Sequence, residues 1–221
     1  MGNLAIIPAR GGSKRIPKKN IRDFLGKPII AYPIEIAIKS ELFERVIVST
    51  DDLEIAEVAK KYGAEVPFLR SQKNSDDFAT LADVIDEVVD KLPDSFDYVC
   101  CILPTAPLLQ VKHLMESFKL LKLEGFDSIR PVVQFSYPIQ KAFKLDINGS
   151  LSKYFSSDFS KRSQDFEMAF HDAGLFYWMS SKARLQGQKK GGYTISTMES
   201  QDIDNLDDWE LAILKYKALY H

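Results

Sequence analysis

Cysteine is scarce in this chain of 221 residues, which contains only Cys100 and Cys101. The two are adjacent in a predicted strand, so their side chains point to opposite faces of the sheet. They cannot form a metal cluster on their own, and free thiols suit a reducing compartment. Cysteine usage therefore predicts a cytoplasmic protein.

Long apolar runs and an excess of one charge are also missing. The longest apolar stretches fall far short of the roughly 20 residues that cross a membrane. The chain begins with a strand and a charged loop, which differs from the long apolar segment of a signal peptide. The formal net charge of −2 gives no long-range attraction to nucleic acid. We expect neither membranes nor nucleic acids as partners.

Apolar runs that predict strands alternate with amphipathic segments that predict helices. One helix face carries apolar residues at i, i+3, i+4, i+7, i+8 and i+11, namely Leu81, Val84, Ile85, Val88, Val89 and Leu92. Further helices are expected at about 28–40, 52–62, 110–124 and 206–219, and strands at 4–7, 46–48, 98–103, 127–133, 174–179 and 193–197. This rhythm predicts a three-layer α/β fold with a mainly parallel sheet. Without a Pro/Ser/Gly-rich linker, residues 1–221 should form a single domain.

The stretch at about 134–172 interrupts this rhythm and is predicted to be an insertion. It is rich in aromatic and polar residues, and Asn148-Gly149 is a strong signal for a β-hairpin turn. A later segment, 186–192, is basic and contains glycine, so we expect a solvated surface loop there.

A basic, glycine-containing loop follows the first predicted strand and matches neither of two common phosphate-binding motifs. The G-x-x-x-x-G-K-[ST] spacing of a Walker A loop and the G-x-G-x-x-G of dinucleotide sites are both absent. The loop nevertheless combines Gly11, Gly12 and Ser13 with five cationic residues, namely Arg10, Lys14, Arg15, Lys18 and Lys19. Parallel sheets bind ligands beyond the carboxyl ends of their strands. The loop therefore predicts a polyphosphate site, with a solvated basic loop as the alternative.

The residues in and after this loop resemble the sialate-type cytidylyltransferases. The resemblance rests on P-A-R-G-G-S-K-x-[IL]-P-x-K-N from Pro8, D-x-x-G-K-P-I-I-A-Y-x-I-E-x-A from Asp23, V-x-V-S-T-D-D from Val46 and Q-D-I-D from Gln201. Segments 62–71, 74–80, 98–102 and 161–165 resemble in particular the subfamily that activates pseudaminic acid. The match extends from residue 3 to about 216.

This resemblance implies a Rossmann-like nucleotidyltransferase. Such an enzyme would transfer CMP from CTP to the anomeric hydroxyl of a nine-carbon keto acid sugar, pseudaminic acid, and release pyrophosphate. It also implies that segment 134–172 is a dimerisation arm that reaches over the partner's active site in a homodimer. Activation of N-acetylneuraminic or legionaminic acid is one alternative, and a non-catalytic nucleotide-binding regulator is another.

For the nucleotide, the resemblance implies catalytic roles for Arg10, Lys14 and Lys19, which would neutralise the leaving pyrophosphate. The other implied nucleotide-binding residues are Ala9, Gly11, Gly12, Ser13 and Asn20 in the loop, and Arg70, Ala79 and Thr80 before the helix at Leu81. The last three would contact cytosine. An Asp-rich capping turn is the alternative for segment 75–80.

For the sugar, the resemblance implies a site above Leu103, Pro104 and Thr105. Sialic acid relatives carry Gln where this chain has Leu103, which favours a different nonulosonate. Arg162 and Gln164 would bind the substrate carboxylate, since a guanidinium can do so bidentately. A solvated basic turn is the alternative there. Two further residues, Lys141 and Phe176, are assigned to the wall of the sugar site.

Asp202 and Asp204 are the candidate metal ligands. Residues two apart in an extended segment project from one face, and Mg²⁺ commonly binds through one or two carboxylates together with substrate phosphates. From spacing alone, Asp204 could equally cap the helix that begins at 206. The family's D-x-D metal pair favours Mg²⁺ as the cofactor.

Two other polar pairs have simpler explanations. Asp51 and Asp52 precede a predicted helix, so at least one of them should cap it. A supporting contact near the nucleotide edge is the alternative. His171 and Asp172 are adjacent in sequence, and we do not expect them to act as a proton relay.

Overall fold

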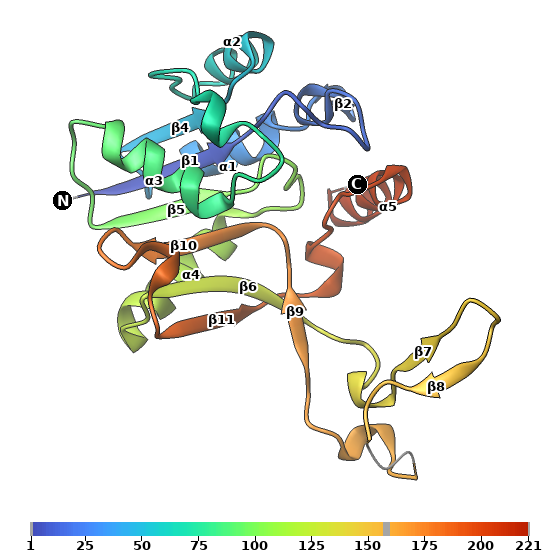
Figure 1. The fold of residues 1–221 in the computed structure, drawn as a ribbon. Coiled ribbons are helices and arrows are strands. Elements are labelled where there is room, and N and C mark those ends of the chain that lie inside the picture. The colour runs from blue at the N-terminus through green and yellow to red at the C-terminus, as the bar shows by residue number, and fades with distance from the viewer. Residues whose placement is uncertain (1, 157–159, 221) are drawn as a thin grey trace.

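The computed structural model describes residues 2–156 and 160–220. Within this part of the chain, the centre is a seven-stranded sheet of order β11-β6-β10-β5-β1-β4, with β9 paired to β6 (Figure 1). Its strands are β1 (Asn3–Pro8), β4 (Arg45–Ser49), β5 (Tyr98–Ile102), β6 (Ser128–Gln134), β9 (Phe170–Asp172), β10 (Phe176–Ser180) and β11 (Lys190–Thr194). Pairing is parallel for β1 with β4 and β5 and for β6 with β11, whereas β10 and β9 run antiparallel to their neighbours. The predicted mainly parallel sheet is confirmed.

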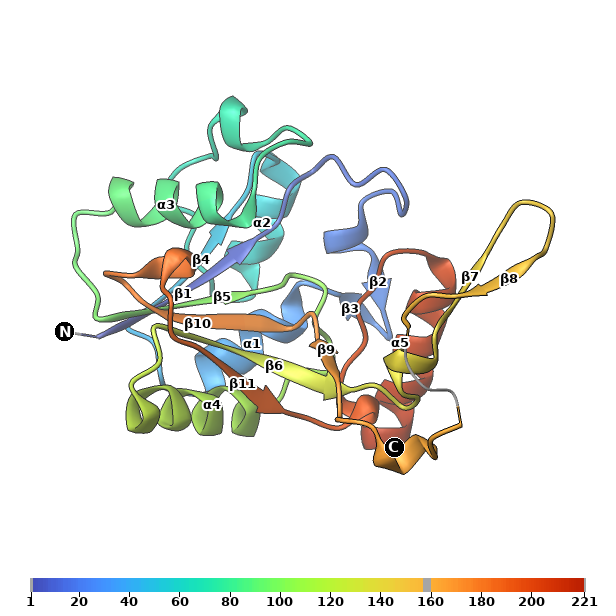
Figure 2. The same ribbon diagram turned by 60° about the horizontal axis from the view of Figure 1, so that its bottom comes forward.

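Helices cover both faces of the sheet, which confirms the predicted three layers (Figure 2). The core on one face includes residues of α1 (Ala31–Lys39), α2 (Leu53–Lys61) and α4 (Val111–Glu124), and the core on the other includes α3 (Leu81–Lys91). Alternation along the strands separates the two cores, because successive side chains point to opposite faces. As predicted, Cys100 lies in the first core and Cys101 in the second.

The last helix, α5 (Leu206–Tyr220), packs beside the short hairpin of β2 (Asp23–Phe24) and β3 (Lys27–Pro28). Its Trp209 and Ala212 join Phe24, Ile29 and Ile203 in a third apolar cluster. This cluster anchors α5 near the loop that follows β1. None of the helices in the described ranges has the length and apolar content needed to span a membrane.

The predicted boundary between a loop at 186–192 and a strand at 193–197 was wrong. Strand β11 occupies Lys190–Thr194 instead of 193–197, and residues 197–199 form a 3₁₀ turn. Gly191 pairs with Ile129 in the sheet, and a Cβ atom there would lie 2.5 Å from Cδ2 of Phe126. The glycine is therefore a close-packing position within a strand, although the sequence pattern indicated a loop.

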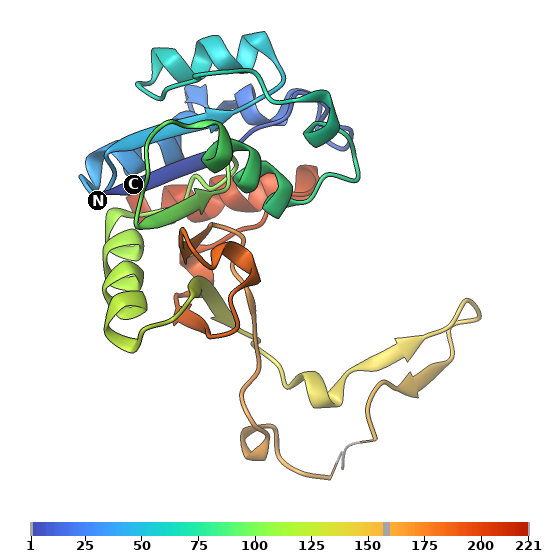
Figure 3. The same cartoon turned by 60° about the vertical axis from the view of Figure 1, so that its left-hand side comes forward.

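Segment 134–172 leaves the sheet at the end of β6 and returns to it at β9, and its residues 157–159 lie outside the described part of the chain. We call the segment the arm. It contains the hairpin of β7 (Phe143–Leu145) and β8 (Leu151–Lys153), with Asn148-Gly149 at the turn as predicted. Two 3₁₀ turns flank the hairpin, η3 (Ile139–Lys141) and η4 (Ser163–Asp165). The arm projects away from the sheet and its helices (Figures 1 and 3).

Glu87 on α3 holds the segment that precedes this helix. Its side chain is 6% exposed and accepts hydrogen bonds from Ser71 N at 3.0 Å, Ser71 Oγ at 3.1 Å and Asn74 Nδ2 at 2.7 Å. Lys91 forms an ion pair with it. Burial alone would raise the pKa of the Glu87 carboxyl, but hydrogen bonds from Lys91, Asn74 and Ser71 outweigh it and lower this pKa to about 2.

Replacing Glu87 with Gln should lower the free energy of unfolding by about 1–3 kcal/mol at neutral pH, because one amide cannot satisfy all these donors. A carboxylate with a lowered folded-state pKa stabilises the fold fully above its unfolded pKa of 4.5 and progressively less as the pH falls toward 2. The difference in free energy of unfolding between wild type and Glu87→Gln should therefore narrow as the pH falls from 4.5 toward 2. Urea unfolding followed by circular dichroism measures it, and a constant gap would contradict this role.

Candidate functional site

Two adjoining pockets lie at the carboxyl ends of the parallel strands β1 and β5. The basic pocket has a volume of about 250 Å³ and is lined by Pro8, Arg10, Ser13, Lys14, Arg15, Ile16, Lys19, Asn20, Leu103, Pro104, Thr105 and Asp202. The α3 pocket has a volume of about 260 Å³ and is lined by Pro8, Arg10, Arg70, Asn74, Asp76, Asp77, Ala79, Thr80, Leu81, Val84 and Leu103. The pockets share Pro8, Arg10 and Leu103. Most of the predicted nucleotide residues are thus brought together.

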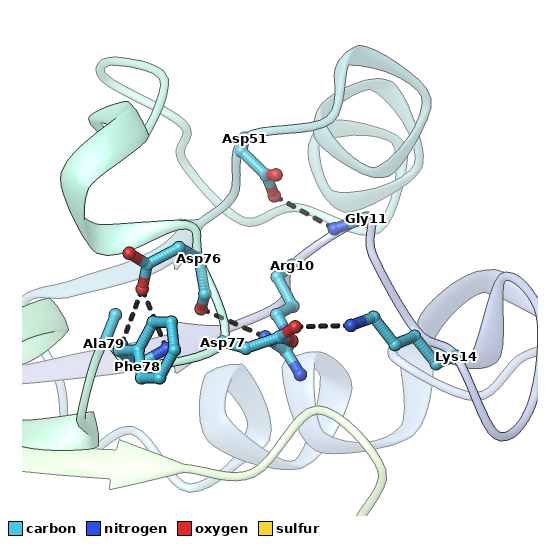
Figure 4. Close-up of polar contacts among 8 residues, drawn as sticks. All are labelled: Arg10, Gly11, Lys14, Asp51, Asp76, Asp77, Phe78 and Ala79. Carbon is cyan, nitrogen blue, oxygen red and sulfur yellow. Dashed lines mark hydrogen bonds and ion pairs between the residues drawn. The ribbon is translucent and has the colours of Figure 1, made fainter.

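The loop after β1 is held in place by contacts to its main chain. Asn20 is buried and donates from Nδ2 to Arg10 O at 2.9 Å. Asp51 accepts from Gly11 N at 2.9 Å (Figure 4). Ala9 is fully buried and donates from its N–H to Ser49 O at 2.9 Å. These bonds hold the main chain of the loop, and the side chains of Arg10 and Lys14 line the basic pocket.

Arg10 and Lys14 converge on one carboxylate, that of Asp77 (Figure 4). Arg10 Nη1 lies 3.0 Å from Asp77 Oδ1 and also donates to Asp76 O at 3.1 Å, while Lys14 Nζ contacts Asp77 Oδ2. Hydrogen bonding and attraction by Lys14, with a smaller part from Arg10, lower the pKa of the Asp77 carboxyl. The two cations therefore already form an anion-binding pair, and Asp77 occupies it.

The other three cations of the loop have separate surroundings. Lys19 Nζ donates to Ile203 O at 2.6 Å, and burial lowers its pKa although Asp204 and Asp202 oppose this. Arg15 Nη2 lies 2.8 Å from Asp204 Oδ1. Lys18 Nζ lies 2.5 Å from Glu54 Oε2 at the start of α2. Lys19 and Arg15 therefore tie the basic loop to the acidic segment at 202–204.

Arg70, Ala79 and Thr80 all line the α3 pocket, as predicted for a nucleotide site. Arg70 is buried, and its guanidinium donates to Ser49 Oγ at 3.1 Å and to Ser49 O. Burial lowers the pKa of Arg70, against the attraction of Asp51 and Glu87. Thr80 caps α3 in a reciprocal pair with Asp83, and Ala79 N donates to Asp76. Segment 75–80 is thus a capping turn that also forms a pocket wall.

Asp202 and Asp204 lie between the basic loop and α5. Burial, together with repulsion by Asp204, raises the pKa of the Asp202 carboxyl. Asp202 also packs against Gly174, whose φ is +65° and where a Cβ atom would lie 3.1 Å from the Asp202 Cβ. Crowded, partly buried carboxylates of this kind favour a bound cation, because it removes their repulsion.

The capping interpretation of Asp204 is wrong. Asn205 Oδ1 accepts from Asp208 N at 3.0 Å, and Asp208 Oδ2 accepts from Asn205 N at 3.1 Å. This reciprocal pair satisfies the start of α5 without Asp204. No group of three or more His, Cys, Asp or Glu side chains suited to a metal occurs among the described residues. A magnesium ion at Asp202 and Asp204 would therefore need further ligands, such as phosphate oxygens and water, to complete its coordination.

The residues predicted to bind sugar fall into three places. Leu103, Pro104 and Thr105 line the basic pocket. Phe176 is fully buried in the core under the sheet and contributes no surface to either pocket. Lys141 lies in η3, and Arg162 and Gln164 lie at η4, both in the arm that projects away from the sheet (Figures 1 and 3). None of the three lines the basic pocket or the α3 pocket. One chain alone does not bring these three residues to the pocket.

The two other polar pairs, Asp51 with Asp52 and His171 with Asp172, each divide between separate contacts. Asp52 caps α2 through Glu54 N and Ile55 N, whereas Asp51 supports Gly11. His171 Nδ1 contacts the main-chain oxygen of Asp172 at 2.8 Å. The Asp172 carboxylate instead lies 3.0 Å from Arg130 Nη1 and 2.9 Å from Gly174 N. As expected, His171 and Asp172 do not form a proton relay.

Sequence reasoning missed two residues at this site, Asp77 and Gly174, and the contact between Arg15 and Asp204. The cation density of the loop indicated Arg15, but not its partner Asp204. Asp77 and Gly174 had no sequence signal, since their contacts join segments 63 and 28 positions apart in the chain. Such long-range contacts depend on how the sheet brings its loops together.

Comparison with known proteins agrees with this geometry. The family model described as Cytidylyltransferase matches residues 4–206. A pseudaminic acid cytidylyltransferase of Campylobacter jejuni is 42% identical, over 99% of this chain and 97% of the relative. A CMP-N,N'-diacetyllegionaminic acid synthase of Legionella pneumophila is 34% identical, over 94% of this chain and 93% of the relative.

Solved structures show a similar fold at much lower identity. A CMP:2-keto-3-deoxy-manno-octonic acid synthetase complexed with CTP superposes with a TM-score of 0.72, at 16% identity, over 99% of this chain and 100% of the other. The basic loop, the α3 pocket and the Asp202–Asp204 segment all lie within residues 4–206. Both the extent of the family match and the full-length relatives lead to one conclusion: the chain belongs to the cytidylyltransferase family.

Proposed function

We propose that this enzyme transfers CMP from CTP to the anomeric hydroxyl of pseudaminic acid and releases pyrophosphate. The observation that carries the proposal is the junction of the two pockets at Arg10, with Asp202 in the lining of the basic pocket. The α3 pocket can hold the cytosine base, and the basic pocket can hold the triphosphate. The sugar assignment is supported by the Campylobacter jejuni relative, which matches over nearly the full length of both chains.

In the reaction, the sugar hydroxyl oxygen forms a bond to the α-phosphorus while the bond to the pyrophosphate oxygen breaks. Arg10 and Lys14 would bind phosphate oxygens in place of Asp77 and neutralise the leaving group. Asn20 and Asp51 keep the loop backbone fixed, so these cations are in position before the nucleotide arrives. Such preorganised charge lowers the barrier without reorganisation during the reaction.

Asp202 and Asp204 would hold a magnesium ion. Bound Mg²⁺ supplies positive charge that stabilises the phosphate oxygens as charge shifts to the leaving group. Lys19 of the basic loop donates to Ile203 O and so ties the loop to the acidic segment.

The sugar is proposed to be bound jointly by two chains of a homodimer. Lys141, Arg162 and Gln164 lie on the arm, apart from their own chain's pocket, so a partner's arm would have to deliver them. The arm also exposes many apolar side chains, which marks a surface for association; they are Phe143, Leu145, Ile147, Leu151, Tyr154 and Met168. A two-fold dimer would cover this surface.

The direct test of the function is pyrophosphate release from CTP with a panel of nonulosonic acids. We expect a preference for pseudaminic over N-acetylneuraminic acid of at least about tenfold in kcat/KM, because an unpaired buried polar group costs about 1–3 kcal/mol. Leu103→Gln should reduce this preference for pseudaminic acid. Equal use of both sugars would reject the sugar assignment, and the absence of pyrophosphate release with every sugar would reject the reaction.

Asp77 should act as a competitor of the nucleotide. Asp77→Asn removes the charge that occupies Arg10 and Lys14, so KM for CTP should fall by about twofold to fivefold, the scale of an exposed ion pair. Arg10→Ala, as the contrasting variant, should lower kcat on the order of 10²–10³-fold. Initial rates at varied CTP measure both. A higher KM in Asp77→Asn would mean that Asp77 orients the cations rather than competing.

Asp202→Asn and Asp204→Asn should each raise the Mg²⁺ concentration for half-maximal activity by more than about tenfold, since an amide oxygen binds a hard cation less well. Thermal unfolding of Asp204→Asn should stay close to that of the wild type, because Asn205 and Asp208 cap α5. An unchanged Mg²⁺ requirement in both variants would remove these residues from the metal site.

Mixing Arg10→Ala subunits with Arg162→Ala subunits should restore activity if the site is shared. In a two-fold dimer, each mixed pair would contain one intact site, so random mixing should recover about one quarter of wild-type activity. Native mass spectrometry confirms that mixed dimers form. No recovery in their presence would place each site within a single chain.

A further inference from the structure

Lys215 of α5 is a buried cation whose hydrogen bonds all go to one short segment. Its side chain is 9% exposed, and Nζ donates to Thr197 O at 2.9 Å, Ser200 O at 2.7 Å and Gln201 Oε1 at 2.9 Å. An ammonium group has three protons, so these three acceptors use its full donor capacity. All three are neutral oxygens, and the segment they belong to leads directly into Asp202.

Asp208 holds the other end of the same segment. It lies seven residues before Lys215, which places both side chains on one face of α5. Asp208 Oδ2 accepts from Asp204 N at 3.0 Å, and Asp208 Oδ1 accepts from Gln201 Nε2 at 3.4 Å. The Gln201 amide thus bridges Lys215 and Asp208. Together these residues fix the backbone on both sides of Asp202.

Packing holds this segment at Ile203, which is fully buried in the third apolar cluster, whereas its polar residues border open space. A cavity of about 520 Å³ lies beside it, and its lining includes Ser200, Gln201, Asp202, Asp204, Asp208 and Lys215. The segment also contacts the turn after β9: Asp202 is close to Gly174, and Ser200 Oγ donates to Ala173 O at 3.2 Å. Without the bonds from α5, the segment could relax toward the cavity. The helix is anchored by Trp209 and Ala212 in the third apolar cluster, through contacts that do not involve Lys215 or Asp208.

We propose that Lys215, Gln201 and Asp208 form a positioning unit that holds Asp202, which lines the basic pocket, and Asp204 next to it in place for metal and phosphate. The proposal rests on the proposed function, since it concerns the same site. Groups that orient metal ligands typically contribute 10- to 100-fold to metal affinity. The unit therefore acts through the two carboxylates, and none of its three members needs to touch the substrate.

The test compares Lys215→Met with Lys217→Met, a matched control at an exposed position of the same helix. Lys215→Met should raise the Mg²⁺ concentration for half-maximal pyrophosphate release by about tenfold or more, and Lys217→Met should leave it unchanged. Calorimetric titration of Mn²⁺ in the presence of a non-hydrolysable CTP analogue gives a readout independent of turnover. It should show the same weakening, and Lys215→Arg should restore part of the affinity.

Gln201→Leu provides a second route if Lys215→Met fails to fold. It removes the bridge while leaving the charge on α5, and it should also weaken Mn²⁺ binding. When both variants fold, the double variant should bind Mn²⁺ no more weakly than the weaker-binding of the two single variants. The effects of residues that act as one unit do not add. Wild-type Mn²⁺ affinity in either folded variant overturns the proposal, even if its melting temperature falls. Failure of wild-type enzyme to release pyrophosphate would instead reject the proposed function.

Discussion

The parallel pairing of β1 with both β4 and β5 is the constraint on which the site depends. Because the three strands run in the same direction, the loops that follow them emerge at one edge of the sheet. The loop after β1 supplies the cations, the loop after β4 supplies Asp51, and the segment after β5 supplies Leu103, Pro104 and Thr105. Burial of β1 on both faces makes this arrangement rigid, since its side chains belong to two separate cores.

Charge balance within the site follows from the same arrangement. Arg10 and Lys14 contact Asp77, while Arg15 contacts Asp204 and Lys19 lies close to the acidic pair. Five loop cations would repel one another without such partners. Under the proposed function, a nucleotide would bind by replacing carboxylate oxygens with phosphate oxygens, which exchanges one set of charge-assisted bonds for another. The protein thus keeps its cations in place without a ligand.

Much of the fold could be predicted because it depends on local periodicity. The five predicted helices and the first five predicted strands are present near their expected positions, and the Asn148-Gly149 hairpin was correctly identified. Strand β11 was misplaced because glycine normally signals a turn, whereas Gly191 makes room for the Phe126 ring. Likewise, spacing alone could not decide the role of Asp204. The adjacent Asn205 takes the capping role, and that choice depends on the side-chain geometry at the start of α5.

The sequence alone predicts an α/β sheet covered on both faces, a basic loop after the first strand and a pair of carboxylates near the last helix. These follow from apolar periodicity and from residue types at fixed spacings, which act over a few positions. The partners of those groups were decided by tertiary packing: Asp77 for Arg10 and Lys14, Gly174 for Asp202, and Lys215 for the segment before Asp202. The physical reason is that a hydrogen bond or ion pair requires atoms within about 3 Å. Only the folded sheet brings segments so distant in sequence that close together.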